Sequence, residues 1–217
     1  MLLLVRFVDE STGSPTSWVW DFGDGKGGSG KTTSHEYDNS GTYIVSLTIT
    51  DLATVDWILE THVHADHLSA ARYLKSRFVC AQSGIGAGIR EVRSLIEPGA
   101  EDPGQCFDRL FEEGDRINLG HACGRVLATP GHTPACISYR FEDLVFVGDA
   151  LFMPDFGTAR TDFPGGDAGL LYDSIQKTLS LPDDTRLFMC HDYKAPGRDK
   201  YAWETTVAEQ RDNNIHI

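Results

Sequence analysis

The chain has 217 residues, of which 41% are hydrophobic and 24% charged, enough for one buried domain or for one domain with a small module. A formal net charge of -13 at pH 7 argues against nucleic acid or an anionic membrane as the main partner, because both repel an acidic surface. The five cysteines are scattered and form no C-x-x-C pair, so neither a disulfide framework nor a cysteine zinc site is expected. A reducing, cytoplasmic setting fits best.

The first fifty residues have the pattern of an all-β segment. The apolar start MLLLV is interrupted by Arg6 and Asp9, far short of a signal peptide or a membrane span, so it is expected to form a buried strand. SWVWDFG places Trp18, Trp20 and Phe22 on one strand face. In GTYIVSLTIT, apolar residues at every second position predict a half-buried strand whose inner face carries Tyr43, Val45, Leu47 and Ile49.

Residues 25–32, GKGGSGKT, match the pattern of a nucleotide-binding loop. Such a loop requires a helix directly after it, because the N–H groups of the first helical turn hold the phosphates. Here a turn-rich segment leads instead to the strand at Tyr43, and the Gly/Ser composition is that of a flexible connector. The sequence therefore predicts a hairpin loop that binds neither ATP nor GTP.

The same fifty residues carry the motif W-D-F-G-D-G at residues 20–25, followed by H-x-Y at 35–37 and G-T-Y at 41–43. This combination closely resembles the PKD repeat, a small immunoglobulin-like β-sandwich. The resemblance implies that residues 1–51 form a PKD-like β segment and that residues 52–217 form a second domain. The Gly/Ser stretch lies where that family has a variable hairpin.

From about residue 52 the pattern becomes α/β. The segments TVDWILETH, DLVFVGDA and TRLFMCHDY are apolar strands that end in polar residues. DHLSAARYLKSR is expected to be helical, and AGLLYDSIQKTLSL places Leu171, Ile175 and Leu179 on one helical face. Binding and catalytic residues of α/β folds usually lie at the carboxyl ends of the strands. The polar clusters of this chain lie in the same kind of position.

A dense group of metal-ligand side chains follows the first of these strands. The motif THVHADH contains His62, His64, Asp66 and His67. His62 and His64 alternate along an extended segment, so both can point into one cavity, and Asp66 and His67 begin the next turn. Imidazole and carboxylate ligands together suit zinc, iron or manganese.

Three further candidates lie in later loops. TPGHTPA contains His132, VFVGDAL contains Asp149 at the end of a strand, and FMCHDY contains His191 in the same kind of position. Each would be a weak signal alone, because a single histidine in a loop is usually only solvated. Together, the order of these three residues and their positions after strands strengthen the prediction of one shared metal site.

The set H-x-H-x-D-H, G-H-T, G-D and C-H-D-Y resembles the metallo-β-lactamase superfamily from about residue 54 onward. The resemblance implies an α/β (α+β) fold, an αββα sandwich with a metal site at one edge. One metal position would use His62, His64 and His132. The second would use Asp66, His67 and His191, with Asp149 between the two.

Finer features resemble bacterial persulfide dioxygenases, which are relatives of the glyoxalase II thioesterases. They are the segments TVDWILETHVHADHLSAARYLK, GIGAGIREV, MPDFGTARTDFPGGDA and CHDYKAPGRDKYAWETTVAEQRDNN. The resemblance implies one Fe(II) per chain, held by His62, His132 and Asp149 with three coordination sites left open. The other ligand-type residues would then orient those ligands. Asp66, Arg160 and Tyr193 are the candidate catalytic residues, with Arg160 near a glutathione substrate and Tyr193 the weaker candidate.

The sequence alone leaves three alternative functions. The first is an iron-dependent dioxygenase that converts glutathione persulfide and dioxygen to sulfite and glutathione. The second is a hydrolase of thioesters or lactones with two zinc ions, in which a metal-bound water attacks a carbonyl. The third is a chimera with little or no catalysis. The expected partner is a small-molecule thiol or persulfide, without nucleic acid or membrane, and a homodimer stays open.

The third hypothesis rests on the first fifty residues, because a PKD-like segment stands where the superfamily has its first antiparallel strands. The strand GTYIVSLTIT passes almost directly into DLATVDWILE. This short passage favours a single compact body in which the PKD-like strands add to the first sheet and cover its edge.

Overall fold

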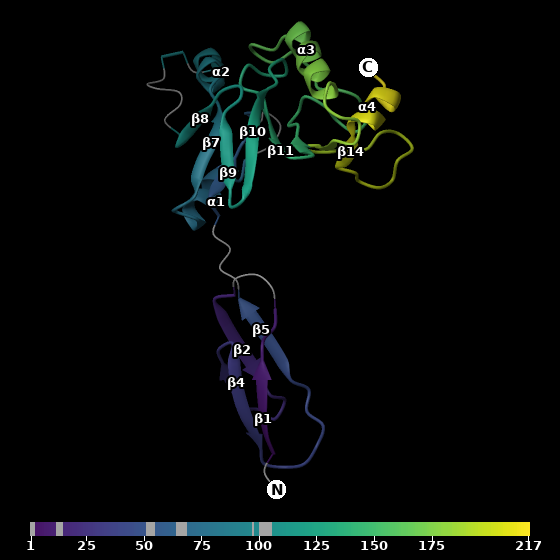
Figure 1. The fold of residues 1–217 in the computed structure, drawn as a ribbon. Helices are drawn as coiled ribbons and strands as arrows, with labels where there is room; N and C mark the ends of the chain where they lie inside the picture. Colours follow the sequence, from purple (N-terminus) through teal and green to yellow (C-terminus); the bar gives the residue numbers. More distant parts are fainter. Residues whose placement is uncertain (1–2, 12–14, 51–54, 64–68, 97, 100–105) are drawn as a thin grey trace. The chain divides into compact units, whose positions relative to one another are not determined.

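The computed structural model describes residues 3–11, 15–50, 55–63, 69–96, 98–99 and 106–217. Two compact units divide the chain, Met1–Thr54 and Val55–Ile217, and each is described by itself (Figure 1). The boundary expected at residues 51 and 52 falls outside the described residues. Within the described part of the chain, no helix has both the length and the apolar composition that a membrane span requires.

The described residues of the first unit form five strands in two antiparallel sheets. One sheet pairs β1 (Leu3–Val8) with β4 (Thr32–Tyr37), and the other has the order β3 (Gly27–Ser29), β2 (Ser17–Asp21), β5 (Ser46–Thr50). Trp20, Phe22 and Tyr37 form the buried core, and the partly buried Val5, Phe7, Tyr43, Val45 and Leu47 pack against it. The three predicted strands are present as β1, β2 and β5. The third begins at Ser46, after Tyr43 and Val45, and Ile49, expected on the inner face, is exposed.

The glycine-rich stretch is built into these sheets. Gly27–Ser29 pairs with Val19–Asp21, and the next strand begins at Thr32, directly after Lys31. The indole Nε1 of Trp20 donates a hydrogen bond to the carbonyl of Gly30 at 2.9 Å. A strand therefore follows Lys31 where a nucleotide-binding loop requires a helix. This strand lies in the segment that was expected to be a turn-rich link, so only the absence of a helix after Lys31 agrees with the prediction.

The expectation that these strands extend the first sheet of the second unit is wrong. That sheet contains only β6, β7 and β8 among the described residues, and β1 to β5 pair only with one another. The physical reason is that the five strands already bury a shared aromatic core and pair each other's backbone groups.

The first sheet of the second unit is parallel, in the order β6 (Trp57–Leu59), β7 (Gln82–Gly86), β8 (Arg109–Phe111). The helix α1 (Ala71–Arg77) lies in the connection from β6 to β7, and α2 (Ile89–Ile96) follows β7. A buried cluster joins Ile85 of β7 to Ile89 and Val92 of α2, so α2 covers one face of this sheet.

The second sheet has six strands, in the order β14, β13, β12, β11, β10, β9. Their bounds are β9 (Arg116–Leu119), β10 (Ala122–Ala128), β11 (Ile137–Phe141), β12 (Leu144–Phe146), β13 (Arg186–Phe188) and β14 (Glu204–Thr206). Only β12 and β13 pair in parallel. Two helices complete the unit, α3 (Ala168–Leu179) before β13 and α4 (Val207–Asn213) after β14.

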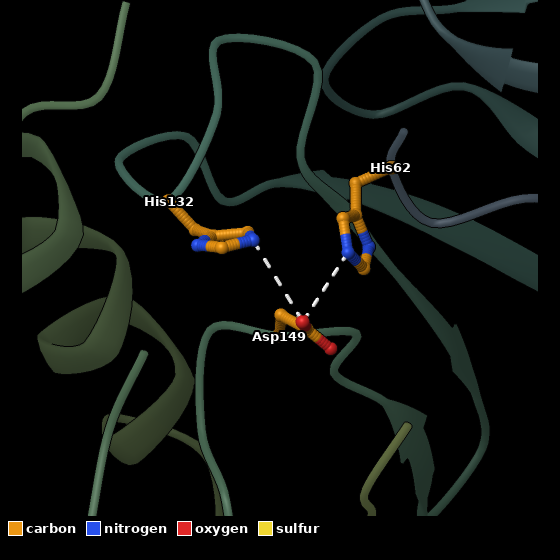
Figure 2. A group of neighbouring side chains, drawn as sticks. All are labelled: His62, His132 and Asp149. Atoms are coloured by element: carbon orange, nitrogen blue, oxygen red, sulfur yellow. Dashed lines mark ion pairs between the residues drawn. The ribbon is translucent and has the colours of Figure 1, made fainter. Parts of the chain in front are cut away.

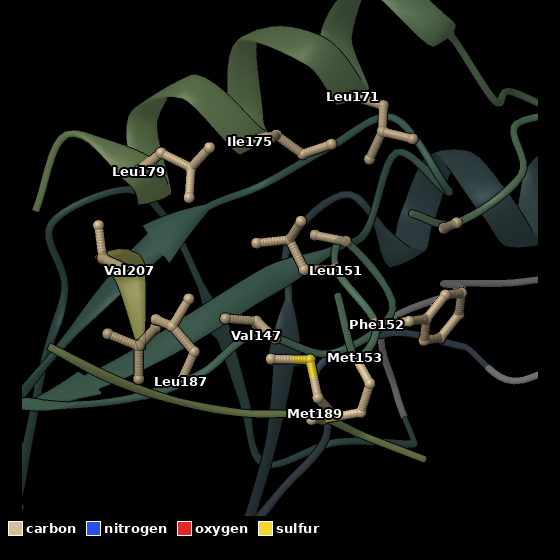
Figure 3. Packing of buried hydrophobic residues seen from close by; sticks show 13 residues of the cluster. Val147, Leu151, Phe152, Met153, Leu171, Ile175, Leu179, Leu187, Met189 and Val207 are labelled. Atoms are coloured by element: carbon tan, nitrogen blue, oxygen red, sulfur yellow. The ribbon is translucent and has the colours of Figure 1, made fainter. Parts of the chain in front are cut away.

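Hydrophobic clusters hold the layers together. Phe111 of the first sheet packs with Ile117, Val126 and Tyr139 of the second, so the two sheets face each other. On the outer face of the second sheet, α3 directs Leu171, Ile175 and Leu179 toward Val147 and Leu187 (Figure 3). The resulting order of helix, sheet, sheet and helix is the αββα sandwich that the sequence predicted.

Candidate metal centre

The second sheet brings three loops to one edge. Strands β10, β12 and β13 run in the same direction, because β11 is antiparallel to both β10 and β12 while β13 is parallel to β12. His132 follows β10, Asp149 follows β12 and His191 follows β13. The carboxyl ends of the three strands thus deliver three ligand-type side chains to one edge.

The loop that carries His132 lies against the start of α3. Gly131 has φ +137°, and a Cβ there would lie 2.3 Å from the backbone of Leu171. The Gly131 carbonyl accepts a hydrogen bond from the N–H of Asp167, the N-cap residue of α3, and the Pro130 carbonyl accepts one from Ser174 Oγ. Only glycine permits this close approach, which fixes the position of the next residue, His132.

His62 comes from the other sheet, three residues after β6 ends. Thr61, the residue before it, accepts a hydrogen bond at its carbonyl from the N–H of Ile137. Thr61 also lies against Gly148, where an added Cβ would be 2.9 Å from both Cβ and Oγ1 of Thr61. Gly148 directly precedes Asp149, so this contact brings the end of β12 close to the segment that carries His62.

The side chains of His62, His132 and Asp149 converge at this point (Figure 2). Nε2 of His62 lies 3.4 Å from Oδ2 of Asp149, and Nε2 of His132 lies 3.7 Å from the same oxygen. All three residues are buried, at 2%, 7% and 4% exposure respectively. A buried carboxylate between two imidazoles is a common arrangement of metal ligands.

Hydrogen bonds orient both rings. Nδ1 of His132 lies 2.8 Å from the carbonyl oxygen of Arg160. A carbonyl can only accept, so Nδ1 carries the proton and Nε2 of the neutral ring keeps its lone pair toward Asp149. Nδ1 of His62 lies 3.0 Å from the hydroxyl oxygen of Thr61, which can accept a hydrogen bond from Nδ1–H in the same way. Both Nε2 atoms can therefore ligate one ion.

The donor separations fit a first-row divalent ion. Two ligands at bond lengths of about 2.0–2.1 Å are about 3.4 Å apart in tetrahedral and about 2.9 Å apart in octahedral geometry. The observed separations of 3.4 and 3.7 Å are close to the first value, and a small inward movement of the side chains reaches the second. Oδ1 of Asp149 is buried, and no hydrogen-bond donor among the described residues contacts it. A bound cation would compensate for the cost of burying this oxygen without a partner. Burial raises the pKa of Asp149, but the contact with His62 and the positive charge that the surrounding imidazoles carry when they are protonated outweigh this effect. The pKa therefore lies well below its usual range, and the carboxylate stays ionised.

His191 lies on the same carboxylate. Its Nε2 is 3.2 Å from Oδ2 of Asp149, and its ring is partly exposed. The next residue, Asp192, accepts hydrogen bonds from both terminal nitrogens of Arg198, which also binds Asp155 through its Nε and Nη2 atoms. This clamp joins the loop after β13 to the loop after Asp149, so it holds His191 and Asp149 on the same side of the sheet edge.

A cavity of about 390 Å³ opens on the metal-ligand group. His132 and Asp149 line it together with Thr158, Ala159, Arg160 and the aromatic residues Phe152, Phe156, Phe163 and Tyr193. The guanidinium of Arg160 lies 4.6 Å over the ring of Phe163, and the ring of Tyr193 contacts His191 edge-on at 4.6 Å. A larger hollow of about 820 Å³ reaches only His62 of the three buried ligands, so the aromatic cavity is the better candidate for the substrate.

The structure thus brings together His62, His132, Asp149 and His191, and it places Arg160 and Tyr193 in the wall of the adjoining cavity. The other predicted ligands, His64, Asp66 and His67, lie outside the described residues. The sequence did not reveal Thr61, Gly148 or the Asp192–Arg198 clamp. The segment HDYKAPGRDK contains both members of the clamp, but it does not show that they meet.

Comparison with known proteins agrees with this architecture. The model of the metallo-beta-lactamase superfamily matches residues 39–191, and the model of the PKD domain matches residues 2–62. Over 181 residues the chain is 49% identical to a protein of Burkholderia pseudomallei (strain 1710b) named "Probable metallo-hydrolase", covering 76% of this chain and 61% of that protein.

Two further relatives carry a more specific name. The chain is 35% identical over 140 residues to the human mitochondrial persulfide dioxygenase ETHE1, covering 63% of this chain and 49% of that protein. The crystal structure of ETHE1 from Myxococcus xanthus matches with a TM-score of 0.60 and 37% identity, over 75% of this chain and 62% of that one. The chain thus spans about half to three fifths of the length of these relatives. From the family match, the identity and the shared fold together, the chain belongs to the metallo-β-lactamase superfamily.

Proposed function

We propose that the chain is an iron-dependent persulfide dioxygenase that oxidises glutathione persulfide to sulfite. The observation that carries the proposal is the buried group of two imidazoles and one carboxylate beside an aromatic cavity. Two histidines and one carboxylate are the ligand set of non-haem Fe(II) oxygenases, which leave open positions for substrate and dioxygen. Bound by His62, His132 and Asp149, Fe(II) supplies the redox chemistry that the reaction with dioxygen requires.

The residues around the ligands have separate tasks in this proposal. The aromatic side chains of Phe152, Phe156 and Tyr193 contact one another and line the cavity, so they would keep bulk water away from the persulfide sulfur. The guanidinium of Arg160 is largely exposed at the cavity, where it can bind a carboxylate of glutathione. The backbone carbonyl of Arg160 also accepts a hydrogen bond from His132. In this proposal Arg160 therefore binds the substrate through its side chain and orients a metal ligand through its backbone.

Similarity to the human persulfide dioxygenase and to the Myxococcus structure supports this proposal. A metal-dependent hydrolase of thioesters or lactones is the second candidate, because a relative that is 49% identical is named as a metallo-hydrolase. The position of His191 on Asp149 also favours this alternative, since a second ion could bind there. A fusion of a PKD-like unit with a superfamily unit that has lost catalysis is the third.

The test reconstitutes the full chain without oxygen, in one sample with one equivalent of Fe(II) and in another with excess Zn²⁺. The iron protein is expected to consume dioxygen and release sulfite from glutathione persulfide. Hydrolysis of a glutathione thioester by the zinc protein, with no dioxygen uptake by the iron protein, would support the hydrolase. Metal binding without either reaction would favour the inactive fusion.

Arg160 gives the substrate proposal a matched control. Arg160→Ala is expected to raise KM for glutathione persulfide about tenfold or more while kcat changes little, because the lost contact lies away from the reacting sulfur. Arg125→Ala removes an exposed arginine of β10 that does not line the cavity, so it is expected to leave KM unchanged. Equal KM values for the two variants would contradict the assigned role of Arg160.

A further inference from the structure

The carboxyl-terminal residues of the chain contact one wall of the aromatic cavity. Residues 152–160, called the wall segment below, contain several residues that line it: Phe152, Phe156, Thr158, Ala159 and Arg160. The segment folds back on itself, because the N–H of Phe152 donates a hydrogen bond to the carbonyl of Gly157 at 3.0 Å. Helix α4 and the residues after it supply polar groups that bind this segment.

Two buried amide side chains join α4 to the wall segment. Nε2 of Gln210 donates a hydrogen bond to the carbonyl of Phe152 at 2.9 Å, and its Oε1 accepts one from Nδ2 of Asn214 at 2.6 Å. Nδ2 of Asn214 also donates to the carbonyl of Gly157 at 3.1 Å. Because both amides are buried, removing either side chain would leave buried polar atoms without their partner.

His216 makes a further contact near the end of the wall segment. Its backbone N–H donates to Oδ1 of Asn214 at 2.9 Å. Nδ1 of its ring accepts a hydrogen bond from the backbone N–H of Thr158 at 3.0 Å, since an N–H can only donate. Gly157 has φ +97°, and a Cβ there would lie 2.3 Å from Nδ1 of His216. A glycine at this position therefore permits the close approach of the ring.

The wall segment connects these contacts to the site. Arg160 lies two residues after Thr158, its side chain lines the cavity, and its carbonyl accepts a hydrogen bond from His132. Among the described residues that line the cavity, none comes from 210–217, so these residues can affect it only through the wall segment. His132 is also held through Gly131, which lies against α3. Loosening of the wall segment is therefore expected to change the cavity more than the metal ligands.

We propose that His216, supported by Asn214 and Gln210, is a positioning residue that fixes the wall segment in the shape that binds the substrate. The identity of that substrate, glutathione persulfide, rests on the function proposed above, whereas the order of the wall segment does not. A wall that is already ordered spares the cost of ordering it when the substrate binds. Loss of the His216 contact is therefore expected to weaken substrate binding while the metal stays bound.

Hydrogen–deuterium exchange of the full chain tests whether His216 orders the wall segment. The chain is loaded with Co²⁺ as a probe ion, without oxygen, and exchange is followed in peptides that contain Thr158. His216→Ala removes the acceptor of the Thr158 N–H, so exchange is expected to become about tenfold faster or more. His216→Asn should restore slow exchange, because the amide oxygen can accept the same hydrogen bond.

Arg211→Met is the matched control. Arg211 belongs to the same helix, but it donates to the carbonyls of Leu179 and Leu181 at the end of α3. It is expected to leave exchange in the Thr158 peptides unchanged. Equal exchange in His216→Ala and the wild type would overturn the proposal. An equal acceleration in Arg211→Met would also contradict it, because that result would reflect a general loss of stability.

Calorimetric titration of the same cobalt-loaded proteins with glutathione, the product thiol, measures the effect on binding. The Kd is expected to rise about two- to tenfold in His216→Ala and to stay at the wild-type value in His216→Asn and Arg211→Met, with equal cobalt content in all four proteins. Faster exchange with unchanged affinity in His216→Ala would refute the positioning role. A wild type that binds no glutathione would overturn the proposed substrate, while the exchange rates would still decide whether His216 orders the wall segment.

Discussion

The contact between Gly148 and Thr61 gives a sharp test of how the metal-ligand group is assembled. Gly148 has φ +58°, a conformation that disfavours any side chain, and an added Cβ would lie 2.9 Å from two atoms of Thr61. Gly120 has the same φ of +58°, but no atom of the described residues lies within 4 Å of an added Cβ there. Gly148→Ala and Gly120→Ala therefore share the backbone strain and differ only in the contact.

The expected magnitudes follow from these two terms. A left-handed backbone costs alanine about 1–2 kcal/mol, and both variants should lose that amount of unfolding free energy. Carbon atoms normally approach to about 3.5–4.0 Å, so the new methyl group at Gly148 must push Thr61 away. Overpacking of this kind costs about 1–3 kcal/mol more. The displaced segment carries His62, so cobalt affinity is expected to fall about 10–100-fold in Gly148→Ala.

Denaturant unfolding of the metal-free chain and cobalt titration measure the two effects separately. The reasoning predicts a larger loss of stability in Gly148→Ala than in Gly120→Ala, and weaker cobalt binding only in Gly148→Ala. Equal cobalt affinity in both variants would show that the approach of Gly148 to Thr61 does not position the ligands.

Three further predictions concern other parts of the chain. Trp20→Ala should cost about 3–5 kcal/mol of unfolding free energy in urea, because the ring is buried in the core of the first unit, and a cost below about 1 kcal/mol would contradict this. Lys31→Ala should change neither stability nor activity, and nucleotide binding lost in this variant would restore the nucleotide-loop interpretation. Asp192→Asn should destabilise the chain at pH 7 by about 1–3 kcal/mol. Hydrogen bonds from Arg198 hold the pKa of Asp192 well below its usual range, so its contribution is full above about pH 4 and is lost as the pH falls through the folded pKa. Unfolding measured from pH 5 to pH 2 should therefore show a weaker pH dependence in this variant than in the wild type.

The convergence of the ligand-type residues could be predicted because their positions depend on local sequence. His62, Asp149 and His191 each follow an apolar run that ends in polar residues, and the carboxyl ends of strands are where such residues meet. The strand at β5 and the helix α3 were predictable for the same reason, since their apolar residues repeat at every second position or along one helical face.

The contacts that orient the ligands could not be predicted, because they join residues far apart in the chain. The carbonyl of Arg160 holds His132 across 28 residues, and Asp155 meets Arg198 across 43. Spacing along the sequence carries no information about a ligand from another strand.

Iron analysis of three proteins tests the central claim most directly. Wild type, Asp149→Ala and His191→Ala are reconstituted with Fe(II) without oxygen, freed of unbound iron, and measured for iron per chain. Wild type should hold one iron, and His191→Ala should retain it, because His62, His132 and Asp149 remain in place. Asp149→Ala should lose it, since that change removes the one carboxylate among these three residues. Two irons in the wild type, or iron retained in Asp149→Ala, would contradict a single iron held by these three residues.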